Sequence, residues 1–136
     1  MRKKVFCILF ATLLVFIPIN AEAQKHVEMI TGDNVKVRCA LNIDKKLFGT
    51  DSAIATTKVI EYKDENQYLA ENRIAVRIET WTSAKCMYEY QYKKGKNSVT
   101  AKSTPVKGVD HFASRHSIDN VTNTKEIHYL VLYGTR

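Results

Sequence analysis

The feature that most constrains the fold of this chain is a hydrophobic alternation with a period of two residues. Apolar side chains occupy every second position from Val35 to Ile43, and Lys36, Arg38 and Asn42 lie between them. Successive side chains of a β-strand point to opposite faces, so this pattern predicts a strand with one buried and one solvated face. Such strands must pack in layers around a shared core.

Similar patterns predict six or seven strands. The predicted ranges are 27–30, 35–43, 53–63, 74–81, 86–93, 98–103 and 126–133. Turn-forming residues 94–97 predict a hairpin between the strands on either side, and the last strand, apolar on both sides, is expected to be central. Residues 64–72 and 108–124 are expected to be loops, with a short helical turn as the alternative. We therefore expect an all-β domain with room for one short helix, an antiparallel β-sandwich or a small barrel.

The N-terminus has the layout of a secretory signal peptide. Three basic residues, 2–4, precede an apolar run from Val5 to Ile17, and Ala21-Glu22-Ala23 resembles a cleavage site. The run is too short to span a bilayer. We therefore expect cleavage after residue 23, a single domain over residues 24–136, a periplasmic or secreted destination, and no stable membrane insertion after cleavage.

Two cysteines remain once Cys7 leaves with the signal peptide. Cys39 and Cys86 both fall on the apolar side of their predicted strands, and disulfides persist in exported proteins. The sequence therefore predicts a Cys39–Cys86 disulfide across the core. A reactive thiol or a metal pair is the alternative, but the two cysteines lack the close spacing of zinc and redox sites. No metal or other cofactor is expected.

A row of aromatic residues next to lysines is the best candidate for a binding site. Its members are Trp81, Tyr88, Tyr90, Tyr92, Lys93, Lys94 and Lys96. Tyrosines on a sheet give rigid contact area, and the formal charge of +7 attracts anions. The three tyrosines could equally form a wall of the core, whereas Trp81 is expected to face outward. We expect a protein partner or an anionic glycan, and no nucleic acid.

Signals for catalysis are weak. Asp110, His111 and His116 could be ligands or acid–base groups, and Ser114, His116 and Asp119 could form a nucleophilic set, but neither group has a recognised spacing. We therefore expect a non-catalytic exported binding or inhibitory protein. A small hydrolase-like enzyme using the 108–120 loop is one alternative. A subunit of a surface appendage or toxin assembly, completed at an open sheet edge, is another; the sequence predicts no oligomeric state.

Overall fold

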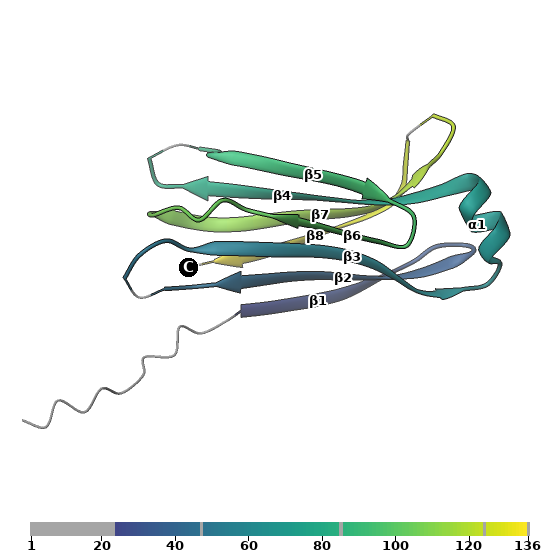
Figure 1. The fold of residues 1–136 in the computed structure, drawn as a ribbon, viewed down its shortest axis with the longest axis horizontal. Coiled ribbons are helices and arrows are strands. Elements are labelled where there is room, and N and C mark those ends of the chain that lie inside the picture. Colours follow the sequence, from purple (N-terminus) through teal and green to yellow (C-terminus); the bar gives the residue numbers. More distant parts are fainter. Residues whose placement is uncertain (1–23, 47, 85, 124, 136) are drawn as a thin grey trace, which may run out of the picture.

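The computed structural model describes residues 24–46, 48–84, 86–123 and 125–135. Within these residues the chain forms two antiparallel sheets of four strands each, stacked face to face, and one short helix (Figure 1). The predicted all-β sandwich is confirmed, and the alternative of a closed barrel is wrong. The structure has more strands than predicted because residues 109–120 also form one.

The first sheet has the strand order β1-β2-β3-β6. Its strands are β1 (Gln24–Thr31), β2 (Val35–Asp44), β3 (Ser52–Tyr62) and β6 (Ser98–Lys102). The second sheet has the order β5-β4-β7-β8. Its strands are β4 (Asn72–Thr82), β5 (Glu89–Gly95), β7 (Val109–Asn120) and β8 (Glu126–Thr135). β5 packs beside β6, and β1 beside β8, so the two sheets also meet along both lateral edges.

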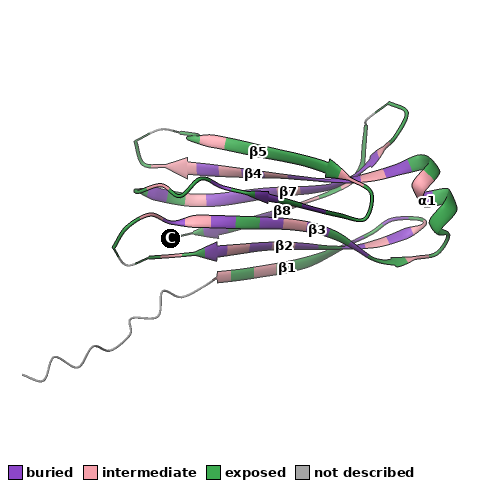
Figure 2. Ribbon diagram, viewed as in Figure 1, coloured by how far each residue is buried: buried purple, intermediate pink, exposed green. Residues whose placement is uncertain are grey.

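The core lies between the sheets and is built from inward-facing side chains (Figure 2). The alternating series on β2 is buried throughout, as the sequence predicted. Its members are Val35, Val37, Cys39, Leu41 and Ile43. The sheets approach closely near the C-terminus, where a Cβ on Gly134 of β8 would overlap Cδ1 of Ile43. Any larger residue at this position would therefore displace the Ile43 side chain.

A seven-residue helix, α1 (Glu65–Glu71), carries the chain from the first sheet to the second. The Asp64 carboxylate caps its N-terminus by accepting the backbone N–H of Gln67 at 2.9 Å. Tyr68 is fully buried, and its hydroxyl donates to the carbonyl of Lys96 at 2.7 Å. The loop expected over 64–72 is therefore mostly helix, and the short-helix alternative is confirmed.

β7 is the strand that the sequence pattern misses, since residues 108–124 appear irregular. Its inward positions include the polar residues Ser114 and His116, so the sequence lacks the apolar residue at every second position that marks a buried strand face. A register shift against β4 also interrupts the alternation, so that Val109 and Phe112 are both buried although they are three residues apart. A β-bulge of this kind adds one residue to the period of two.

Two predicted relationships between strands are wrong. β5 and β6 are joined at residues 96–97, as the turn signal predicted, but they belong to different sheets and do not form a hairpin. β8 lies at the edge of its sheet, where its apolar residues predicted a central position. Its outward side chains, including Tyr129 and Tyr133, are exposed instead of covered.

The predicted disulfide is also wrong, because Cys39 and Cys86 are both free thiols. Cys39 is buried within the sandwich, and this burial, with the carboxylate of Glu28 nearby, raises the pKa of its thiol to about 12. Cys86 is exposed in the connection between β4 and β5. The prediction assumed that Cys86 continues the series of inward-facing residues of β4. That strand ends at Thr82, and Cys86 lies beyond it in an exposed connection.

The predicted signal peptide, residues 1–23, lies outside the described residues, as does Cys7. In the part of the chain that the structure describes, no helix has the length and apolar character needed to cross a bilayer. Cleavage and export stay predictions.

Candidate functional site

The outer face of the β5-β4-β7-β8 sheet concentrates exposed aromatic side chains. Alternate residues of each strand point away from the core, and the strand register sets them in rows across the sheet. We call this surface, formed by Trp81, Tyr90, Tyr92, His111, Tyr129 and Tyr133, the aromatic face. The exposed fractions of its four tyrosines range from 50% to 63%. Scattered exposed apolar residues are normal on a protein, but a group gathered on one sheet face is typical of an interaction site.

Arg77 and Glu79, the charged residues of β4 next to Tyr90 and Trp81, are paired with each other. Arg77 Nη2 lies 2.8 Å from Glu79 Oε1, and the guanidinium covers the ring of Tyr90 at 4.4 Å from its centroid. The indole N–H of Trp81 donates to Glu79 Oε2 at 3.1 Å. Stacking of a guanidinium on an aromatic ring fixes both groups. This half of the face is therefore ordered before any ligand binds.

The β7 and β8 half repeats the arrangement. Arg115 Nε donates to Glu126 Oε1 at 3.0 Å, and its guanidinium lies 3.9 Å from the ring centroid of Tyr129. The hydrogen bond from Arg115 lowers the pKa of the Glu126 carboxyl, although partial burial opposes that shift. Lys94 Nζ lies 3.5 Å from Oδ2 of Asp119. Three cations of this face are thus each matched by a carboxylate.

A groove of about 200 Å³ opens in the middle of the aromatic face. The small side chain of Ala113 forms its floor, because the neighbouring positions in the same register row, Glu79 and Tyr133, carry larger side chains. Trp81 and His111 line the groove as a stacked pair, with ring centroids 5.4 Å apart and planes 13° from parallel. The groove is of a size to hold one amino-acid side chain or one sugar ring.

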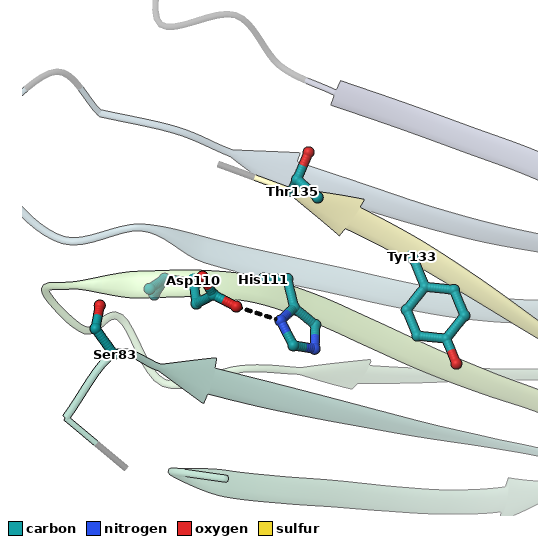
Figure 3. Close-up of a pocket in the computed structure, with 6 residues that line it drawn as sticks. Ser83, Asp110, His111, Tyr133 and Thr135 are labelled. Atoms are coloured by element: carbon teal, nitrogen blue, oxygen red, sulfur yellow. Dashed lines mark hydrogen bonds and ion pairs between the residues drawn. The ribbon is translucent and has the colours of Figure 1, made fainter. Parts of the chain in front are cut away.

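A second, wider cavity of about 620 Å³ adjoins this groove at the end of the sandwich and shares His111 and Tyr133 with it (Figure 3). Ser83 and Thr135 also line it. The Asp110 carboxylate lies 2.7 Å from His111 Nδ1, which holds the imidazole in one orientation. A carboxylate-oriented imidazole is suited to proton transfer as well as to ligand binding.

The structure decides between the two interpretations of the tyrosine row. Tyr88, Tyr90 and Tyr92 are all exposed, and the register places Tyr90 and Tyr92 opposite the outward residues of β4 and not toward the core. Tyr90 and Tyr92 join the aromatic face with Trp81, while Tyr88 lies just before β5. Burial raises the pKa of Tyr92, and the neighbouring carboxylate of Asp119 adds to the shift. These tyrosines are therefore surface residues and not a wall of the core.

The predicted lysines do not form one cluster. Lys94 shares the aromatic face, where it is paired with Asp119. Lys93 lies on the opposite side of β5, in register with the inward-facing Val76, and Lys96 is in the turn that leads to β6. These three lysines thus have three different surroundings, although they are close together in the sequence.

The nucleophilic set considered from the sequence is divided by the strand that carries it. Ser114 and His116 face the core and are fully buried. Asp119 is also buried, but it lies on the opposite side of β7 and accepts a hydrogen bond from the hydroxyl of Ser117 at 2.6 Å. The three residues of the set therefore cannot act together. The expected 108–120 loop is itself almost entirely strand β7.

The buried histidine instead links the two sheets. The hydroxyl of Thr57, on β3, donates to the carbonyl of Ala75 at 3.1 Å and lies 2.8 Å from His116 Nδ1. Since Thr57 has one proton to donate, Nδ1 of His116 must carry a proton, and Nε2 then accepts from the Ser114 hydroxyl at 2.8 Å. Burial lowers the pKa of His116 to about 4, so the imidazole is neutral at pH 7.

Sequence reasoning missed the β7 and β8 contributions to the aromatic face. Tyr129 and Tyr133 alternate with Leu130 and Leu132, and this pattern was consistent with a strand buried on both sides. The signal that separates the two sides is the residue type, since a tyrosine keeps a polar hydroxyl and is common at contact surfaces. Arg115 gave no signal because its strand was not predicted.

Among residues 24–46, 48–84, 86–123 and 125–135, no three His, Cys, Asp or Glu side chains gather as metal ligands would. The chemistry of the groove and of the adjoining cavity is therefore that of the side chains that line them. Any function assigned to them depends on that chemistry, because comparison with protein-family models, curated proteins and solved structures finds no match to this chain.

Proposed function

We propose that this chain is a non-catalytic, exported binding protein that recognises a protein partner through its aromatic face. One observation carries the proposal: four half-exposed tyrosines, a tryptophan and two arginines share a single sheet face with a groove in its middle. Tyrosine, tryptophan and arginine are the residues most enriched at the energetic centres of protein interfaces. A groove among them can hold an anchoring side chain of the partner.

The charges favour a protein over an anionic glycan at this face. Arg77, Arg115 and Lys94 are each paired with a carboxylate of the same surface. An anionic sugar would have to compete with those carboxylates. A protein interface tolerates internally paired charges because they stay matched when water is removed.

The experiment uses Trp81, the single tryptophan of the chain, as a reporter within the groove. A partner is first captured from an envelope extract at high salt, where an electrostatic contact is screened and a packed one persists. The purified partner is then titrated against the protein while the emission of Trp81 is recorded. We expect a saturable blue shift with a defined Kd.

Two variants test whether the groove is the contact. Ala113→Leu fills the groove and Tyr133→Ser removes one wall, and each should weaken binding by about thirty-fold, the size of an interface hot spot. Ile60→Ser, an exposed apolar position on the other sheet, is the matched control and should bind as the wild type does. Equal Kd values for all three variants would refute the proposal, as would saturable binding of a soluble glycan that the captured protein cannot displace.

A second candidate function is supported by the Asp110–His111 pair at the mouth of the wide cavity. An oriented imidazole in a cavity that Ser83 and Tyr133 also line could serve as a general base in a hydrolase-like reaction. Turnover of an ester substrate that His111→Gln abolishes, with thermal stability unchanged, would favour this candidate over the binding protein.

A further inference from the structure

The outer face of the β1-β2-β3-β6 sheet carries cations that are not paired. Each of its four strands contributes one exposed basic residue, and we call these four, Lys25, Arg38, Lys58 and Lys102, the basic face. Across the described ranges, none of the four forms an ion pair. This is the reverse of the aromatic face, where the basic groups are matched.

The strand register spreads these cations over two dimensions. Lys25 and Lys102 share one register row at opposite edges of the sheet, about 14 Å apart for three strand spacings. Arg38 and Lys58 are directly opposite one another in a parallel row, about 13 Å along the strands. The row between them carries Thr56 and other uncharged residues. The basic face is therefore an array and not a line.

No carboxylate lies at the outward positions between the two rows. Asp44 is beyond one end of the array, and Glu61 faces Lys36 beyond the other. Like charges directly opposite on adjacent strands destabilise a sheet. The pairing of Arg38 with Lys58 therefore costs stability in the free protein and is relieved when an anionic surface covers it.

Exposed apolar side chains are interleaved with the cations. Met29 and Ile54 point outward from the two rows of cations and Val27 from the row between them, and all three are 38–40% exposed. A single polyanionic chain follows a line and would engage only part of the array. A planar anionic surface engages all four cations together and offers the apolar side chains a boundary to enter.

We propose that the basic face docks the protein on the surface of an anionic lipid bilayer. The bound orientation leaves the aromatic face, on the opposite side of the sandwich, free for its partner (Figure 1). The docking is peripheral: charge attraction holds the sheet against the headgroups, and the three apolar side chains reach only the interface.

Co-sedimentation with vesicles tests this, using the chain over residues 24–136, the predicted mature protein. Vesicles of phosphatidylcholine with a quarter phosphatidylglycerol should bind the protein at low salt and release it at high salt, and vesicles of phosphatidylcholine alone should not bind it. Each cation near an anionic surface contributes about five-fold in affinity, so Arg38→Gln with Lys58→Gln should weaken binding by about thirty-fold.

A matched double variant separates the basic face from net charge. Lys93→Gln with Lys107→Gln removes the same charge from exposed positions elsewhere and should leave vesicle binding within a few-fold of wild type. Equal losses for the two doubles would overturn the proposal, and so would binding of dextran sulfate without binding of the vesicles. The Arg38/Lys58 double should melt no lower than wild type, because it relieves a like-charge contact, so a loss of binding cannot be attributed to unfolding. If the vesicles do not bind, the proposed binding of a protein partner at the groove still stands, because the Ala113 and Tyr133 variants test it separately.

Discussion

The buried histidine makes the stability of this protein depend on pH in a calculable way. His116 lies between the sheets and is hydrogen-bonded on both ring nitrogens in its neutral form. Burial lowers its pKa from 6.5 to about 4. In the unfolded chain the imidazole takes up a proton as the pH falls below 6.5, whereas the folded protein resists protonation until about pH 4. The unfolded state therefore binds more protons in this window, and acid favours unfolding.

The two pKa values set the size of the effect. The contribution of His116 to the free energy of unfolding is fully present above pH 6.5, falls by about 2 kcal/mol by pH 5 and by about 3 kcal/mol by pH 4. Urea unfolding followed by circular dichroism at pH 7, 6, 5 and 4 measures it, since a small single domain is expected to unfold in two states.

A substitution of His116 isolates its contribution to the pH dependence of the free energy of unfolding. His116→Gln retains a donor and an acceptor but cannot titrate, so it should be less stable than the wild type at pH 7, and this difference should shrink by about 3 kcal/mol as the pH falls to 4. Ile60→Ser, an exposed position with no titratable group, should retain the wild-type difference between pH 7 and pH 4. A constant gap between His116→Gln and wild type at every pH would refute the reasoning.

Three further outcomes follow from the packing. Without denaturant, one thiol, that of the exposed Cys86, should react rapidly with a disulfide reagent, while Cys39 should react only on unfolding; rapid labelling of both or of neither would contradict the structure. Gly134→Ala should lower the free energy of unfolding by about 1–3 kcal/mol because its new methyl group overlaps Ile43, measured by urea titration against wild type. Asp64→Ala should cost about 1 kcal/mol through the lost helix cap, and an unchanged melting temperature would show that α1 does not need it.

The fold class was predictable because period-two alternation is a local signal. It depends only on the pleat of a strand, and it located β2 and β4 to within a few residues. The same signal failed on β7, where Ser114 and His116 occupy buried positions and a bulge shifts the period. A buried polar residue is paired through the tertiary structure, here with Thr57 of another strand, and no local window contains that partner.

The order of strands in each sheet could not be predicted from the sequence for a related reason. β8 presents apolar residues on both sides whether it is central or an edge strand with an exposed aromatic surface, and only the position of its neighbours separates the two. Parity likewise assigned Cys86 to the core although the chain had already left β4. A parity argument holds within one strand and loses its meaning across a connection.

The distribution of charge on this protein is likewise not predicted by adjacency in the sequence. The lysines at residues 93–96 are adjacent in the sequence, yet the sheet separates them, and Lys94 is neutralised by Asp119. The four cations of the basic face come from four strands, and it is register that assembles them. In a sandwich, many neighbours on a surface come from different strands, so a run of like charges along the chain is a poor guide to where an anion binds. The density of unpaired charge on each face is the better guide, and it is on that measure that we propose a different partner for each of the two faces.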